Sequence, residues 1–152
     1  MDNLLLLPFI SGFCVLIGLV YGSYYDIKYR ISPKWIWKFI APISLIFTIL
    51  WYIGEFQQTR FTVIIPVIIT SCVFILLSII MAFKQGNGGD WRALFYISLL
   101  TPWVIISVFI TSCVFGVLQI GIAKLRKIET PVPWMVGITL GFVISYGLYF
   151  IR

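Results

Sequence analysis

GNGGDWR, residues 86–92, is a polar, glycine-rich stretch that separates two long apolar runs and contains the carboxylate Asp90. A second carboxylate, Asp26, has a similar setting in YDIKYR, residues 25–30. An ionisable side chain next to membrane-spanning sequence is costly to keep there, so it is a candidate functional group by default. These two aspartates are therefore the residues around which we expect the fold and the chemistry to be arranged.

Composition identifies the class of protein before any motif does. Of 152 residues, 61% are hydrophobic and only 11% are charged, against about 25% charged in soluble domains. The mean hydropathy is +1.08. We predict one integral membrane domain, residues 1–152, whose first apolar run is a retained helix. The net charge is +6, but the chain has no soluble region that could present a basic face to nucleic acid. The expected partner is therefore a lipid bilayer and not nucleic acid.

Six helices are predicted, at about residues 4–26, 35–54, 61–83, 90–100, 103–123 and 134–151. The segment from Trp91 to Ala123 would be about 50 Å long as one helix, whereas the hydrocarbon core is about 30 Å thick. We therefore place a break at Thr101-Pro102. The fourth helix, at about 16 Å, is short for a full span, and the sequence leaves open whether it spans or forms half of a re-entrant element. The expected fold is an all-α transmembrane bundle with a short fourth helix.

The positions of the basic residues predict the orientation of this bundle. With the break, one side receives nine of them, while the other receives only Arg60 and Arg152. Without the break the split falls to seven against four. Basic loops are retained in the cytoplasm, which places both termini outside the cell membrane and both aspartates at its cytoplasmic face. The nine are Lys28, Arg30, Lys34, Lys38, Lys84, Arg92, Lys124, Arg126 and Lys127.

The remaining acids have simpler interpretations. Asp2 lies at the free N-terminus, Glu55 is expected in a solvated external link, and Glu129 adjoins Lys127 in a loop. The chain has no histidine, which excludes histidine-based zinc sites and histidine-containing triads, and we expect no cofactor or metal. Structural alternatives also exist for the pair: Asp26 as an interfacial ion pair with Lys28 or Arg30, and Asp90 as a helix N-cap.

Two aspartates close together favour one chemistry in particular. Carboxyl groups a few Å apart do not both ionise easily, so one acts as general base on a shared water while its protonated partner stabilises the developing oxyanion. Glycines suit both halves of such a site. Gly18, Gly22 and Asp26 share one helical face along which another helix approaches closely. Gly88 and Gly89 permit positive φ before Asp90 and leave room for an extended peptide.

Three motifs together resemble the type IV prepilin peptidases, and most of all the archaeal preflagellin and prepilin peptidases. They are YDIKYRISPKW at residues 25–35, GGDWRAL at 88–94 and PVPW at 131–134. The resemblance extends over nearly the whole chain and implies that Asp26 and Asp90 are the catalytic pair of a GxGD aspartyl protease. Asn87 stands where this pattern has its first glycine, and asparagine tolerates positive φ better than most residues.

The resemblance implies cleavage of short basic leader peptides from pilin-like or archaellin-like precursors at the cytoplasmic face. Two alternatives stay open. One is an intramembrane aspartyl protease of the presenilin or signal-peptide-peptidase type, which is expected to have more helices than this chain. The other is a non-catalytic carrier in which Asp26 and Asp90 bind a proton or cation. Neither the particular substrate nor the oligomeric state follows from the sequence.

Overall fold

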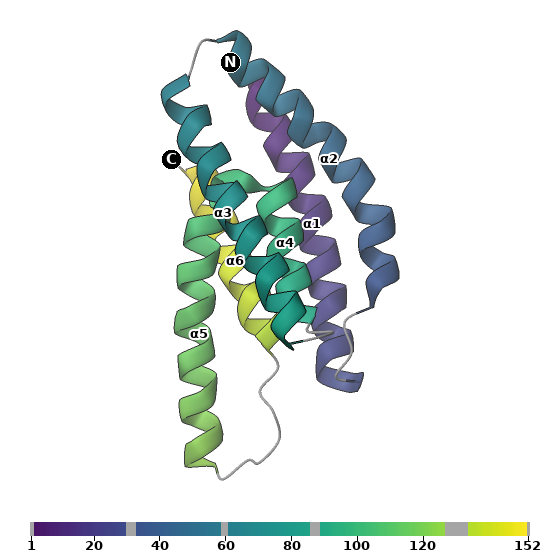
Figure 1. Cartoon of the computed structure of the whole chain (residues 1–152), viewed down its shortest axis with the longest axis vertical. Helices are drawn as coiled ribbons and strands as arrows, with labels where there is room; N and C mark the ends of the chain where they lie inside the picture. The colour runs from purple at the N-terminus through teal and green to yellow at the C-terminus, as the bar shows by residue number, and fades with distance from the viewer. Residues whose placement is uncertain (1, 30–32, 59–60, 86–88, 127–133, 152) are drawn as a thin grey trace.

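The computed structural model describes residues 2–29, 33–58, 61–85, 89–126 and 134–151, without the side chains of 2–4, 84, 85, 89 and 90. Throughout these ranges the secondary structure is helical and no strand occurs. Figure 1 shows α1 (Asp2–Tyr29), α2 (Lys34–Gln57), α3 (Phe61–Gln85), α4 (Gly89–Leu100), α5 (Ile105–Leu125) and α6 (Trp134–Ile151). A single 3-10 turn, η1 (Pro102–Val104), joins α4 to α5.

Five of these helices are long and apolar enough to cross a membrane: α1, α2, α3, α6 and the continuous stretch formed by η1 and α5. Their outward faces expose large apolar side chains such as Phe39, Ile69, Val117 and Leu148, as is expected of helices surrounded by lipid. α4 is the short exception. The predicted all-α membrane bundle with six helices and a short fourth helix is confirmed.

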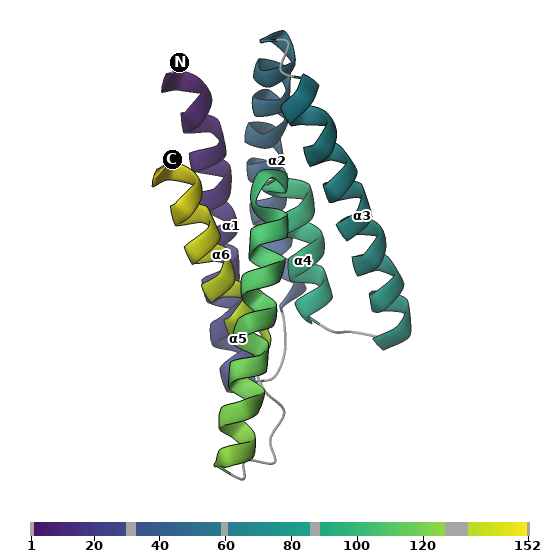
Figure 2. The ribbon, with the colours of Figure 1, turned by 90° about the vertical axis from the view of Figure 1, so that its left-hand side faces the viewer.

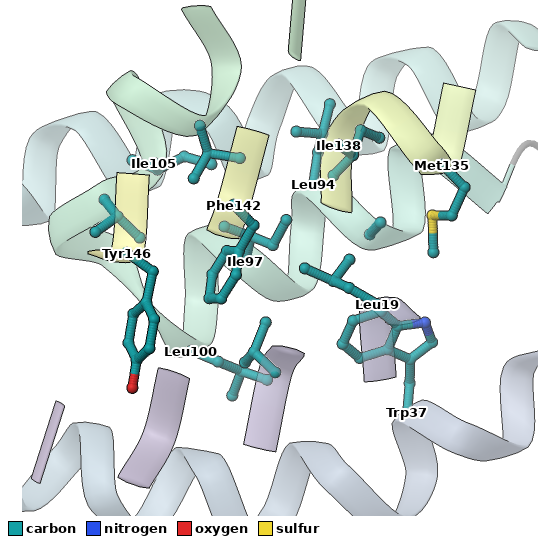
Figure 3. Packing of buried hydrophobic residues seen from close by; sticks show 14 residues of the cluster. Leu19, Trp37, Leu94, Ile97, Leu100, Ile105, Met135, Ile138, Phe142 and Tyr146 are labelled. Atoms are coloured by element: carbon teal, nitrogen blue, oxygen red, sulfur yellow. The ribbon is translucent and has the colours of Figure 1, made fainter. Parts of the chain in front are cut away.

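α4 lies inside the bundle, although it is the shortest helix. Ala93, Ile97 and Leu100 on α4 have no exposed surface, and α4 contacts each of the other five helices. Leu94, Ile97 and Leu100 pack among side chains of α1, α2 and α6, as Figure 3 shows. The helix that begins with Gly89 and Asp90 is therefore held by the core rather than by lipid.

The last turn of α1, which bears Asp26, and the first turn of α4, which bears Asp90, lie toward the same end of the molecule. In Figures 1 and 2 the last turns of α1, the start of α4 and the start of α6 all lie toward the lower end. α1 contacts both α4 and α6. The first turns of α1 and the last turns of α6 lie at the opposite, upper end. Residues distant in sequence thus share one end of the bundle.

The break after α4 lies at the predicted position, with a small difference in detail. Pro102 has no amide hydrogen to donate to the carbonyl four residues earlier, which ends the helix. The Thr101 amide donates to the Ile97 carbonyl at 2.8 Å, and the Val104 amide donates to the Thr101 carbonyl at 3.2 Å. Trp103 and Val104 consequently belong to the 3-10 turn, so α5 begins at Ile105 rather than at Trp103.

Two predicted helix ends were wrong. α1 does not end at Asp26 but continues to Tyr29, because aromatic rings one turn apart pack on each other, with Tyr21–Tyr25 and Tyr25–Tyr29 centroids 5.3 and 5.4 Å apart. α2 continues to Gln57, so Glu55 is a buried helical residue with 8% exposure and not part of a solvated link. Sequence polarity alone had favoured the loop.

Candidate active site

Asp26 lies in the last full turn of α1 and is half-buried. Its Oδ2 atom is inaccessible to solvent and has no hydrogen-bond partner in the described part of the chain. A buried carboxylate oxygen without a partner is costly, and such groups are retained mainly where they act in binding or chemistry. Asp26 therefore has the environment expected of a reactive carboxyl group.

Ser23, one turn before Asp26, attaches this part of α1 to the first turns of α6. Its hydroxyl lies 3.1 Å from the Met135 carbonyl and 2.6 Å from the Thr139 hydroxyl. Thr139 lies in turn 3.2 Å from the Leu19 carbonyl of α1. Hydroxyl contacts between membrane helices have few competing partners in lipid. The register of α1 against α6 is thus fixed directly beside Asp26.

The glycines of α1 allow the close approach that was predicted, but toward two different helices. A Cβ atom on Gly18 would lie 3.0 Å from Ile40 Cδ1 of α2, whereas one on Gly22 would lie 2.7 Å from Met135 Cε of α6. Gly22 is buried. The stripe therefore faces the boundary between α2 and α6, and Gly22 is the member that sets the distance from α1 to the start of α6.

Asp90 is the second residue of α4, directly after Gly89. It lies within the first helical turn rather than before it, where the positive end of the helix dipole favours a negative charge. Its side chain lies outside the described part of the structure. Asn87, Gly88 and Arg30 also lie outside the described residues, so their predicted supporting roles stay predictions.

Trp91, the residue after Asp90, lines an apolar cavity of about 390 Å³ between α4, α5 and α6. Trp134, the first residue of α6, forms another part of the wall. The other lining residues are Leu94, Phe109, Ser112, Cys113 and Ile138. The cavity therefore begins where α4 begins and offers space for an apolar side chain or chain segment next to Asp90.

These contacts place both aspartate-bearing segments beside the first turn of α6. Ser23, one turn from Asp26, bonds to Met135, and Trp91, adjacent to Asp90, shares a cavity wall with Trp134. Trp134 and Met135 are consecutive residues. The two segments, far apart in sequence, therefore reach the same depth in the bundle on either side of one helix terminus.

Lys28 is exposed and contacts tyrosines of its own helix. Its ammonium nitrogen lies 3.3 Å from the Tyr24 hydroxyl and 5.1 Å from the centre of the Tyr29 ring. The structure shows no ion pair between Lys28 and Asp26, both of which are described, which disfavours the Lys28 form of that alternative; Arg30 lies outside the described residues. Aromatic rings at the end of α1 and the start of α2 form a cluster, made of Tyr21, Tyr24, Tyr25, Tyr29 and Trp35. Such aromatic belts mark the membrane–water interface.

A second and larger cavity, about 690 Å³, lies between α2, α3 and α4. It touches α4 only through Ser98 and Leu99, in the last turns of the helix, and otherwise lies near the end of α2 and the first half of α3. It is therefore separated from the start of α4. In the described part of the chain, no group of three metal-ligating side chains comes together.

Sequence reasoning overlooked a buried group of hydroxyls at the other end of α4. Ser11 on α1 and Ser44 and Thr48 on α2 are at most 1% exposed. Ser11 and Thr48 contact the carbonyl of Leu100, and Ser44 bonds to Ser11. Ser44 and Thr48 are one turn apart in an apolar helix, a spacing that puts them on one face. That spacing was the available sequence signal, but their partner on α4 is visible only in the structure.

Comparison with known proteins identifies the family of the chain. No curated protein and no solved structure was matched. A family model described as the type IV leader peptidase family matches residues 13–122, more than half of the chain, and this range includes both aspartates. The match extends from within α1 to within α5. The chain therefore belongs to the type IV leader peptidase family.

Proposed function

We propose that this membrane peptidase is an aspartic endopeptidase whose catalytic pair is Asp26 and Asp90. The observation that supports this most directly is the convergence of the last turn of α1 and the first turn of α4 on the start of α6, through Met135 and Trp134. The buried, unpartnered Oδ2 of Asp26 supports it as well. Two carboxyl groups at one depth suffice for peptide hydrolysis without a metal ion.

In this mechanism one carboxylate removes a proton from a water molecule, which attacks the peptide carbonyl. The other, protonated carboxyl group donates a hydrogen bond to the oxyanion and then a proton to the leaving amine. The first-turn position of Asp90 favours its negative form through the helix dipole, so Asp90 is assigned the role of base and Asp26 that of acid.

The proposed substrates are pilin-like or archaellin-like precursors with short basic leaders, which are cut at the cytoplasmic face of the cell membrane. The excess of basic residues in the loops and helix ends on the same predicted side of the membrane as the aspartates supports this orientation. The cavity beside Trp91 and Trp134 adds support, because its apolar lining suits apolar residues next to the cleaved bond. A peptide arriving from the membrane interface would meet the aspartates and this cavity together.

The test is co-expression with a precursor and measurement of its processing by mobility shift. Asp26→Asn and Asp90→Asn keep the size of each side chain but remove the acid, and each should lower cleavage by about a hundredfold or more. Glu55→Gln is the matched control, because it makes the same change at a buried acid on α2, whose neighbours Tyr52, Ile53 and Phe56 line the larger cavity. It should leave processing unchanged.

Other outcomes would favour the alternatives. Normal processing by the Asp26→Asn/Asp90→Asn double variant would end the proposal. Mass spectrometry of the product distinguishes a leader peptidase, which cuts after the basic leader, from a protease that cuts within the membrane-spanning segment. A carrier would transport an ion with no cleavage by the wild-type protein.

A further inference from the structure

We propose that Ser11, Ser44 and Thr48 form a positioning device that fixes the depth of α4, and through it the position of Asp90. This inference rests on the proposed function, because it concerns the same catalytic pair. The three side chains come from α1 and α2, whereas the group they surround, the Leu100 carbonyl, is the last of α4. The Ser11 and Thr48 hydroxyls lie 2.8 and 2.5 Å from this oxygen.

The Leu100 carbonyl needs these donors because its own helix does not supply one. In a continuous α-helix the Val104 amide would donate to it, but that amide donates to the Thr101 carbonyl in η1. Within lipid no water replaces the missing bond, and a polar group left unsatisfied there is expensive. Two hydroxyls from neighbouring helices therefore complete the end of a helix that stops inside the bundle.

The hydroxyl donors in this group can all form hydrogen bonds at the same time. A carbonyl oxygen accepts two hydrogen bonds and each hydroxyl donates one. Ser11 and Thr48 donate to Leu100, while Ser44, whose Oγ lies 2.6 Å from Ser11 Oγ, donates to Ser11. The arrangement uses both acceptor positions of the carbonyl. It therefore attaches α4 to α1 and α2 simultaneously.

The hydrogen bonds and the apolar contacts of α4 oppose different motions of the helix. Apolar burial is non-directional, so the packing of Ala93 and Ile97 resists removal of α4 but opposes a small slide along its axis only weakly. The Leu100 carbonyl points along that axis, and its hydrogen bonds depend steeply on distance and angle. The hydroxyl group thus fixes the axial register of the helix.

Asp90 is ten residues before Leu100, so it lies about 15 Å away along the same helix. A helix of this length moves as a rigid body, and an axial slide at Leu100 therefore appears in full at Asp90. The position of Asp26 does not change with it, because Ser23 and Gly22 hold that turn of α1 against Met135. A slide of α4 would change the separation of the two carboxyl groups.

The test compares kinetics of Ser11→Ala/Thr48→Val with those of a matched control, Ser98→Ala. Ser98 is a fully buried hydroxyl on α4, but it donates to the Leu94 carbonyl of its own helix at 2.6 Å. The double variant should lower kcat about ten- to a hundredfold, the usual effect of misplacing a catalytic group by about 1 Å, with KM unchanged. Ser98→Ala should retain kcat, and Ser11→Ala/Thr48→Ser should recover most of it.

A cross-linking measurement reports the position directly. In a protein whose native Cys14, Cys72 and Cys113 are replaced by alanine, Asp26→Cys/Asp90→Cys is treated with a short thiol-reactive cross-linker. Addition of Ser11→Ala/Thr48→Val should slow cross-linking, whereas addition of Ser98→Ala should not. A role in stability alone would lower the amount of folded protein without this difference in rate.

The inference is overturned if the folded double variant has the kcat and the cross-linking rate of its parent, or if Ser98→Ala lowers kcat to the same degree. Should the double variant not fold, Thr48→Val, which keeps the Ser11 donor, is judged by the same two criteria. Failure of the proposed function has its own signature, namely cleavage by Asp26→Asn or Asp90→Asn.

Discussion

At the scale of single residues, the site depends on how closely α1 approaches α6. Gly22 is the contact point, because any side chain there would meet Met135. Ser23 then bonds to the Met135 backbone, and Asp26 follows one turn later with its Oδ2 buried. The carboxyl group of Asp26, proposed here as catalytic, is thus placed by its neighbours on the same helix.

Gly22 provides a test at this scale. Gly22→Ala should retain folding and cleavage, because its Cβ would meet the terminal methyl group of Met135, a flexible side chain that adapts to its surroundings. Gly22→Leu should push α1 from α6, lower the free energy of unfolding by about 1–3 kcal/mol and reduce cleavage. Precursor processing and thermal unfolding in detergent measure both effects.

Gly121→Leu is the control for this pair of variants. Gly121 lies on α5, and a Cβ there would have nothing within 4 Å, so the added leucine should change neither property. Equal loss in Gly121→Leu and Gly22→Leu would contradict the argument from close approach.

At the scale of elements, α4 is a short helix held by three kinds of contact. Its first turn adjoins the proposed site, its middle packs in the core and on Trp37, and its last carbonyl receives hydroxyls from α1 and α2. The Tyr96 ring stacks on that of Trp37 with centroids 4.6 Å apart and an angle of 6°. The stack joins α4 to α2 laterally, whereas the hydroxyls join them at the end of the helix.

The stack and the hydroxyls should therefore respond differently to substitution. Tyr96→Ala removes the ring on Trp37 and should lower the free energy of unfolding by about 3 kcal/mol, with kcat of the folded fraction retained. Tyr96→Phe keeps the ring and should behave as wild type. Thermal unfolding and kinetics on the same preparations separate the two effects, and a loss of kcat in Tyr96→Phe would show that the hydroxyl of Tyr96 has a role the stack does not explain.

At the scale of the whole molecule, the α1 end, the α4 start and the α6 start lie together at one end of the bundle. The exposed link residue Gln58 follows α2 at the other end, and the exposed Arg126 follows α5. These two positions report on orientation because they lie at the ends of helices, where a cysteine is accessible to reagents.

The proposed orientation predicts labelling of Gln58→Cys and Arg126→Cys in a protein without its native cysteines. A membrane-impermeant maleimide should label Gln58→Cys in intact cells and Arg126→Cys only after permeabilisation, because the basic residues place α5's last turn inside. The reverse pattern would place the aspartates outside and contradict the assignment of a cytoplasmic site.

Several features followed from the sequence because they depend on composition and local chemistry. Apolar length and Pro102 together predicted six helices with a break after the fourth. The aspartates and their glycines were recognisable as motifs. The helix ends at Tyr29 and Gln57 were not predictable in the same way. Contact between the rings of Tyr25 and Tyr29 outweighed local polarity at the end of α1. Burial of Glu55 outweighed it at the end of α2.

By itself, therefore, the sequence determined the membrane class, the number of helices and the two candidate aspartates, since hydrophobic length and backbone restrictions act locally. Only the tertiary structure decided that Gly22 faces α6 while Gly18 faces α2, and that Ser11 and Thr48 meet the Leu100 carbonyl with Ser44 bonded to Ser11. Such contacts join helices far apart in the chain. Their partners depend on the rotation and depth at which each helix packs, and no local pattern specifies either.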